Sequence, residues 1–295
     1  MINGLLNSSA PLILAGLGAL LSDLGGTLGI FIEGFMITGA FFSWFFAGWT
    51  GSVFLGSIMS AILAALAGWA LARFVRFSGA NPFIAGLALN LAASGITLSL
   101  SAVWFGTKGV LQNPAIVIPG PVIIPFIDDI PFLGNLLSGH SIFTYMALAC
   151  AALTAMALKR TVPGLRLRAS GLSPRSANER GIRSGLYFDG SWAMAAFLAA
   201  LAGAVLTFRV GAYAPGGIAG RGWIALAAVY LGFRNAWGVV LAAIVFTLAE
   251  RIGFGIQGSG VLPATALLGL PSALALLLYS LTMRHGGIPK AQNNG

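Results

Sequence analysis

The side chains of this sequence that could act as catalysts or metal ligands are few and scattered. There is one cysteine, Cys150, inside an apolar run, and there are two histidines, His140 and His285. A metal centre needs several such ligands close together, so a cysteine- or histidine-based metal site is not expected. No acid/base pair or nucleophile with a partnering base is evident either. We therefore expect neither an enzyme nor a bound cofactor.

Two polar side chains, Glu33 and Asn90, interrupt apolar segments. If those segments cross a membrane, a charge at their centre costs about 2.5–3.5 kcal/mol. Glu33 either lines a polar path and accepts hydrogen bonds from a solute, or is a first-turn carboxylate favoured by a helix dipole. Asn90 either binds a solute or cross-links two helices, which is the commoner role of a buried asparagine.

The composition identifies the solvent of these segments. The 295 residues are 58% hydrophobic and 8% charged, and the mean hydropathy is +0.91. Soluble chains carry about 25% charged residues because water must wet their surface. We therefore predict an all-α fold, a polytopic membrane helical bundle made of a single transmembrane domain over residues 1–295. The net charge of +9 is explained by basic cytoplasmic loops rather than by nucleic-acid binding.

Hydropathy predicts eight or nine membrane segments, some of them short or broken. The longer candidates are residues 11–24, 28–49, 52–74, 82–105, 141–158, 190–208, 237–252 and 262–283. The apolar piece at residues 223–233 is too short to cross untilted, so it is a half-helix or part of a re-entrant element. Asn81 and Pro82 are typical of a helix start and precede the fourth segment.

Two polar stretches separate the segments. Residues 106–140 contain five prolines and are expected to form an extracytoplasmic loop, because prolines disfavour a spanning helix. Residues 159–187 are the most polar part of the chain and should be cytoplasmic because they concentrate basic residues. These basic residues are Lys159, Arg160, Arg166, Arg168, Arg175, Arg180 and Arg183.

The alternation of spans predicts an amino end outside the membrane and a carboxyl end in the cytoplasm, provided that residues 223–233 count as a crossing. The basic residues then placed inside are Arg73, Arg76, Arg234, Arg284 and Lys290, and those placed outside are Lys108, Arg209, Arg221 and Arg251. Tryptophans near span ends are expected in an interface belt without a ligand: Trp44, Trp49, Trp69 and Trp104. Asp189 is expected in the first turn of the sixth span, where a helix dipole favours it.

Four short motifs occur in order along the chain. They are Gly26-Thr27-Leu28-Gly29-Ile30-Phe31-Ile32-Glu33-Gly34, Asn81-Pro82 followed by Ala88-Leu89-Asn90, Pro163-Gly164-Leu165-Arg166-Leu167-Arg168-Ala169, and Ala219-Gly220-Arg221-Gly222-Trp223-Ile224-Ala225-Leu226-Ala227-Ala228. Over about residues 10–283 the chain resembles the permease subunits of bacterial ABC importers for simple sugars and nucleosides, the binding-protein-dependent transport system inner membrane component family.

This resemblance implies partners, a location and a solute path. The partners would be two cytoplasmic ABC ATPases, a second permease that is identical or paralogous, an extracytoplasmic solute-binding protein and membrane lipid, with no nucleic acid. The location would be the bacterial inner membrane. The residues placed on the substrate path are Glu33, Phe31, Asn81, Asn90 and Trp223.

The resemblance also implies a coupling helix within residues 171–182 that docks on the ATPase. The residues assigned to it are Pro174, Arg175, Ala177, Glu179, Arg180 and Gly181. The local sequence agrees, because Ser173 before Pro174 is typical of a helix start and Gly181 of a helix stop. The alternative is an ordinary basic loop held near anionic lipid.

Two departures from the family pattern bear on solute and partner. Where the family usually has Asn-Ile-Gly-Leu-Glu-Gly, this chain has Gly29-Ile30-Phe31-Ile32-Glu33-Gly34, which loses an amide and gains a phenyl ring. The ligand is therefore expected to differ from an ordinary nucleoside if this stretch touches it. Glu179 and Arg180 make the coupling helix more charged than usual, which is expected to restrict it to a matching ATPase.

The energy source must lie outside this sequence. No phosphate-binding loop of the Gly-x-x-x-x-Gly-Lys type occurs, because none of the three lysines follows a glycine. ATP is therefore hydrolysed by another subunit, or the energy comes from an ion gradient. The second possibility describes a secondary transporter, and residues 35–69 and 223–250 favour it because they read as an inverted repeat.

Overall fold

The helical membrane bundle is present in the computed structural model, which describes residues 2–113, 116–122, 139–218 and 220–257. Six described helices are long and apolar enough to cross a membrane, and α11 is a shorter apolar helix. The described helices are α1 (Ile2–Leu24), α2 (Ile32–Thr50), α3 (Val53–Ser78), α4 (Pro82–Phe105), α7 (Ile142–Arg160), α8 (Val162–Leu172), α9 (Pro174–Glu179), α10 (Ser184–Val210), α11 (Arg221–Leu231) and α12 (Ala236–Gln257). The predicted all-α class is confirmed.

The chain divides into two compact units, residues 1–244 and 245–295. The first unit carries all the residues predicted for the substrate path and the coupling helix. In the second unit the described residues continue α12 as far as Gln257. The span at residues 262–283 lies outside the described residues, so the total of eight or nine segments and the single domain stay predictions.

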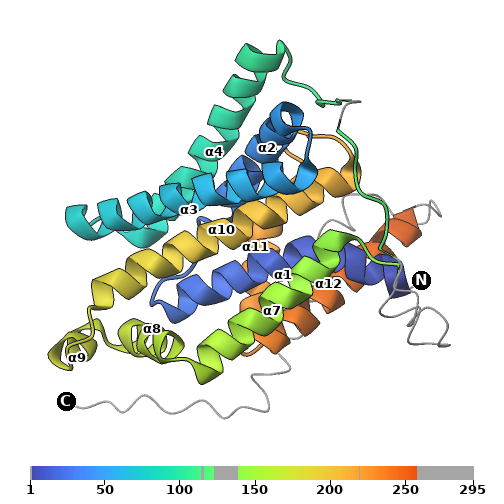
Figure 1. The fold of residues 1–295 in the computed structure, drawn as a ribbon. Coiled ribbons are helices and arrows are strands. Elements are labelled where there is room, and N and C mark those ends of the chain that lie inside the picture. Colours follow the sequence, from blue (N-terminus) through green and yellow to red (C-terminus); the bar gives the residue numbers. More distant parts are fainter. Residues whose placement is uncertain (1, 114–115, 123–138, 219, 258–295) are drawn as a thin grey trace. The chain divides into compact units, whose positions relative to one another are not determined.

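Helix α10 lies at the centre of the first unit and packs along α1, α2 and α3 (Figure 1). Close packing depends on glycine at two contacts. A β-carbon at Gly39 of α2 would meet the backbone of Ala200, and one at Gly203 of α10 would meet the Met36 carbonyl oxygen. Backbone-to-backbone approach of this kind is how helices associate in lipid, where apolar surface gives no drive toward helix contact.

Several predicted boundaries are wrong. Helix α1 begins at Ile2 rather than Pro11, and the hydroxyls of Ser8 and Ser9 are satisfied inside it by carbonyls at 2.7 and 3.0 Å. Helix α2 begins at Ile32 rather than at residue 28, and α3 continues to Ser78. Helix α10 begins at Ser184 rather than at residue 190. In contrast, α4 has the predicted bounds.

The predicted polar loop at residues 159–187 is largely helical. Helix α8 begins after Thr161, whose hydroxyl accepts the Gly164 N–H, and α9 follows directly. The described parts of residues 106–140 beyond α4 contain no helix. Two isolated β-bridges involve these parts, one between Leu111 and Tyr213 and one between Val122 and His140.

The elements define two ends of the first unit. We call the first of these the α9 end. Helix α1 finishes there against α8, and a β-carbon at Gly26 would lie only 3.1 Å from the Cα of Gly171. Helices α3 and α10 also have one end there, the finish of α3 and the start of α10 (Figure 1). At the other, the far end, α2, α4 and α10 finish, and the bridge between Leu111 and Tyr213 lies there.

Candidate functional site

Glu33 occupies the junction at which α2 and α11 begin. Its Oε1 accepts a hydrogen bond of 3.0 Å from the N–H of Gly220, the residue before α11. Gly222 lies so close that a β-carbon there would approach the Cα of Glu33 to 2.7 Å. Oε2 of Glu33 is buried and has no hydrogen-bond partner among the described residues. One carboxylate oxygen is thus left to bind something else where two helix N-termini favour negative charge.

Helices α2 and α11 run from Glu33 toward opposite ends. Helix α2 finishes at the far end, whereas α11 follows the second half of α1 to the α9 end. There Arg234 Nε lies 2.6 Å from the Asp23 carboxylate. Residues 223–233, interpreted as a half-helix or part of a re-entrant element, overlap the 11-residue helix α11, and Arg221 at its start is next to Gly222, which contacts Glu33. Broken helices that meet within a bundle are typical of the solute sites of transporters.

Asn90 and Phe31 hold the loop that precedes Glu33. The Asn90 side chain accepts the N–H of Gly34 at 2.7 Å and donates to the carbonyl of Ile30 at 2.8 Å. Phe31 is fully buried, and its ring centroid lies 4.2 Å from that of Trp192. Both residues therefore lie beside Glu33, and their described contacts are with protein.

Asn81 and Trp223 lie differently. Asn81 is exposed and caps α4, accepting the Phe83 N–H at 2.9 Å. It precedes Asn90 by nine residues, roughly 13 Å along the helix, so it is not part of the Glu33 junction. Trp223 follows Gly222 in α11 and is 47% exposed. The structure thus brings together Glu33, Phe31 and Asn90, with Trp223 one residue beyond the contact with Gly222.

Replacing Asn90 with alanine should destabilise the protein by about 1–3 kcal/mol, because Gly34 N–H and Ile30 C=O lose their partner in a partly buried place. The measurement is thermal unfolding in detergent. Ser94→Ala is the matched control, since Ser94 is an exposed residue of the same helix. Equal stability of the two variants would contradict the role assigned to Asn90.

Helix α9 has the caps that the sequence predicts. The Ser173 hydroxyl accepts the Ser176 N–H at 3.4 Å, and Gly181 beyond the helix has a φ of +77°. Ala177 is buried against the rest of the protein. Arg175 and Glu179, in contrast, are exposed and paired only with each other in the described structure, at 3.4 Å. The helix therefore presents a charged face outward.

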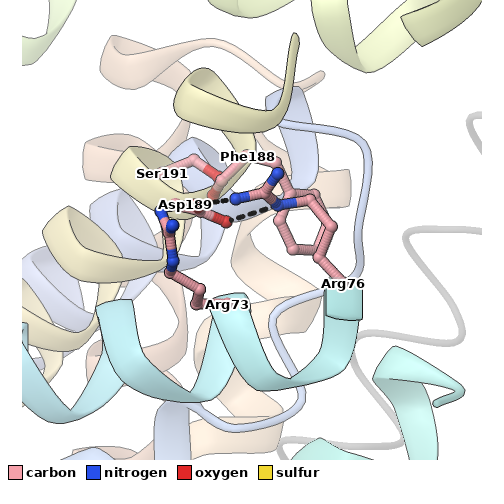
Figure 2. Close-up of polar contacts among 5 residues, drawn as sticks. All are labelled: Arg73, Arg76, Phe188, Asp189 and Ser191. Carbon is pink, nitrogen blue, oxygen red and sulfur yellow. Dashed lines mark hydrogen bonds and ion pairs between the residues drawn. The ribbon is translucent and has the colours of Figure 1, made fainter. Parts of the chain in front are cut away.

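Sequence reasoning missed an ion-pair cluster between α3 and α10. Asp189 is 1% exposed, and Arg76 binds its carboxylate with Nε at 3.1 Å and Nη2 at 2.5 Å (Figure 2). Arg73, one turn earlier, lies 3.9 Å from the same carboxylate. Asp189 was predicted in the first turn of this helix, but α10 begins at Ser184, so Asp189 is its sixth residue and its carboxylate is held by arginine side chains. The only sequence clue was that all three residues were expected near the cytoplasmic surface.

Helix α10 joins α9 to this cluster. The side-chain oxygen of Asn178 in α9 accepts both the N–H and the hydroxyl of Ser184, at 3.0 and 2.9 Å. Gly185, the next residue, leaves room for Arg76, since a β-carbon there would lie 2.6 Å from Nη1. The start of α10 is thus attached to α9 on one side and to α3 on the other.

The same helix reaches the Glu33 junction one turn after Asp189. Trp192 Nε1 donates to the Thr27 hydroxyl at 2.7 Å, and the Trp192 ring packs on Phe31. Helix α10 therefore contacts, in order along its length, α9, α3 and the loop that precedes Glu33.

Apolar helices long enough to span a bilayer and a short helix that begins beside the carboxylate of Glu33 indicate the class of a multi-pass membrane transport protein. The sequence matches, over residues 1–283, the family described as "Branched-chain amino acid transport system / permease component". The chain belongs to this permease family.

Individual relatives match along most of their length. The chain is 28% identical to the nucleoside ABC transporter permease protein NupC of Lactococcus lactis, over 99% of this chain and 94% of that protein. It is 30% identical to the guanosine ABC transporter permease protein NupQ of Bacillus subtilis, over 96% and 92%. It is 26% identical to a putative glucose ABC transporter permease protein of Haloferax volcanii, over 85% and 76%. No solved structure matches the chain significantly.

Proposed function

We propose that this chain is the membrane permease of an ATP-binding-cassette importer and moves a nucleoside or simple-sugar-like solute inward. The observation that carries the proposal is the attachment of the exposed helix α9 to the Glu33 junction through α10, in a chain of this permease family. The relatives named for nucleoside, guanosine and glucose transport support the solute class.

ATP is hydrolysed on separate subunits in this proposal. The sequence has no phosphate-binding loop. Helix α9 has only 6 residues, too few for stability on its own, and a partner's groove would supply contacts to its exposed charged face. Two ATPases, a second permease and an extracytoplasmic binding protein complete the proposed assembly.

The α9 end is proposed to face the cytoplasm. It carries the basic residues of α8 and α9 together with Arg73, Arg76 and Arg234, as basic cytoplasmic segments do. Because α1 finishes at this end, its first residue, Ile2, belongs at the opposite, extracytoplasmic surface of the inner membrane.

The proposed solute path passes the Glu33 junction. The buried Oε2 of Glu33 would accept a hydrogen bond from a solute hydroxyl or N–H, with Phe31 and Asn90 fixing the loop and Trp223 beside it. Asn81 would lie at the cytoplasmic mouth of that path, because it starts α4 at the α9 end.

Reconstitution tests the proposal. The purified chain alone should hydrolyse no ATP, and addition of an ATPase and a binding protein encoded beside it should give hydrolysis stimulated by a nucleoside or sugar. If neither a nucleoside nor a sugar stimulates ATP hydrolysis, the proposed function is wrong.

Reversing the charges of Glu179 and Arg180 together should abolish most solute-stimulated ATP hydrolysis, because the docking face would then repel its partner. Folding should be unaffected, since the Glu179 side chain is 65% exposed and its pair with Arg175 contributes about 0.3–0.5 kcal/mol. Lys108→Glu, at the far end, is the control and should couple normally. Full coupling in the doubly reversed variant would argue against docking through α9.

A second candidate, a secondary transporter, is favoured by one observation. Helices α2 and α11 start at the same carboxylate and run in opposite directions, as expected of an inverted repeat with an ion site at its centre. Uptake that persists in ATP-free vesicles under an ion gradient would establish this candidate in place of the importer.

A further inference from the structure

A pocket lies at the far end of the first unit, between the last turns of α2 and the segment that follows α4. Its volume is about 490 Å³. Its walls combine aromatic rings with side-chain amides, and the residues that matter most are Trp44, Phe45, Trp49, Phe105, Gln112 and Asn113. No charged side chain is among the described residues that line it.

Part of this pocket is rigid before any ligand arrives. Trp44 is only 3% exposed, and its ring is stacked on Phe208 of α10 with centroids 6.1 Å apart. Phe45 packs on Trp104 of α4, with centroids 4.7 Å apart. Trp44 was predicted to lie in a membrane-interface belt, and its burial shows that this prediction is wrong. Packing against α10 and α4 fixes both rings, so a ligand that binds against them causes little loss of side-chain conformational entropy.

The other two rings have open faces. Trp49 is 75% exposed and Phe105 is 42% exposed. An aromatic ring has a polarisable face that a second planar ring can stack on, with centroids roughly 4.5–7 Å apart. The pocket thus has a fixed aromatic floor and two exposed aromatic walls.

The polar side of the pocket is supplied by a segment that folds back over α2. Leu111 and Tyr213 exchange backbone hydrogen bonds of 2.8 and 3.1 Å, and the Ser101 hydroxyl donates to the Thr107 carbonyl at 2.8 Å. These contacts position the adjacent Gln112 and Asn113. A side-chain amide offers both donors and an acceptor, which suits the edge of a heterocycle.

Gly48 keeps the space open. A β-carbon at Gly48 would lie 3.4 Å from the Asn113 amide nitrogen, so any longer side chain there would project into the pocket. Alanine fits at ordinary contact distance, whereas phenylalanine would fill the cavity.

We propose that this pocket receives the base of a nucleoside, stacked on Trp49 and Phe105 with its edge bonded by Gln112 and Asn113. A base is planar and uncharged, and it has both a face and a hydrogen-bonding edge, matching the two kinds of wall. The proposal rests on the proposed function, because the far end is the end at which an external binding protein would deliver solute. It adds a docking step that precedes the Glu33 junction.

The test measures binding of adenosine to the full-length purified protein in lipid nanodiscs by saturation-transfer-difference NMR. The base protons H2 and H8 should receive more saturation than the ribose protons, and glucose should receive little. Trp49→Ala and Gly48→Phe should each remove most of the effect. Gly48→Ala should keep it, which separates filling of the pocket from loss of fold.

Trp237→Ala is the control for tryptophans in general, because Trp237 is 49% exposed at the α9 end, outside the pocket. It should leave the adenosine signal unchanged. Equal losses in the Trp49 and Trp237 variants, unchanged saturation in Gly48→Phe, or stronger saturation of ribose than of base would overturn the proposal.

Transport by the complete complex separates this proposal from the proposed function. Trp49→Ala should raise the KM for adenosine import about tenfold, the loss expected for one aromatic stacking contact, and leave the maximal rate unchanged. Pocket-dependent binding without any import would overturn the proposed function and leave the site. Normal import with an unchanged KM in both pocket variants would overturn the site and leave the proposed function.

Discussion

Replacing Arg76 with alanine is expected to destabilise the protein by about 3 kcal/mol, the low end for breaking a buried ion pair. The change leaves the 1%-exposed carboxylate of Asp189 without its main partner. The loss falls at the low end because Arg73, 3.9 Å away, still offsets part of the charge. Thermal or denaturant unfolding in detergent measures it.

Three further variants, at Arg73, at Asp189 and at both Arg76 and Asp189, distinguish a specific ion pair from general disturbance of the α9 end. Arg73→Ala should cost clearly less than Arg76→Ala, because Arg73 makes the longer contact. Removing both Arg76 and Asp189 should cost less than the sum of the single changes, since neither charge is then left alone. Additive losses would show that the pair is not coupled as described.

The second large effect is expected from Gly203→Ala in α10. The new methyl group would meet the Met36 carbonyl oxygen and come within 2.9 Å of the Ala40 nitrogen, so α2 would have to move away from α10. Backbone cannot yield as a flexible side chain does, and we expect a loss of about 2–3 kcal/mol in stability. Because α2 carries Glu33, solute transport should fall as well.

The matched control is Gly190→Ala on the same helix. A β-carbon at Gly190 meets nothing within 4 Å, so this change should leave stability unchanged or raise it by up to about 1 kcal/mol through helix propensity. A similar loss in both variants would mean that α10 needs glycine for its own conformation rather than for contact with α2.

Local sequence rules predicted those parts of the fold that local chemistry controls. Helix α4 has the expected bounds because Asn81 caps it, Pro82 occupies its first turn and Gly106 takes the left-handed conformation that ends it. Helix α9 was implied by the family resemblance, and the local signals at Ser173, Pro174 and Gly181 agreed with it. In both, the determining contacts lie within a few residues of one another.

Other features depend on partners distant in sequence. The start of α1 was missed because Asn7 and Ser8 lower local hydropathy. In the fold, Asn7 accepts bonds from Thr144 and from the Ser141 N–H, at 2.6 and 3.1 Å. The ion pair of Asp189 was not predicted, because its partner Arg76 is 113 positions away in the sequence.

The candidate site also combines features that the local sequence indicates with features that depend on distant partners. Glu33 was recognised as exceptional from its apolar surroundings, and its two interpretations, solute contact and dipole-favoured first-turn carboxylate, both fit its position. What the sequence could not indicate was the approach of α11, which depends on Gly222 packing against α2. The pocket at the far end was not predicted, because Trp44 and Trp49 were expected in an interface belt without a ligand. The burial of Trp44 contradicts that expectation.

One consequence follows from the length of α10. Its 27 residues extend about 40 Å, and the hydrogen bonds that Ser184, its first residue, donates to Asn178 attach it to α9. A rod held in this way acts as a lever. A tilt of about 5° imposed at the α9 end would move the opposite end of the helix by about 3.5 Å. That movement is enough to shift Phe208 relative to Trp44 and so change the width of the pocket at the far end. In the proposed importer, ATP hydrolysis at the α9 end would thus change the pocket at the far end without any helix bending.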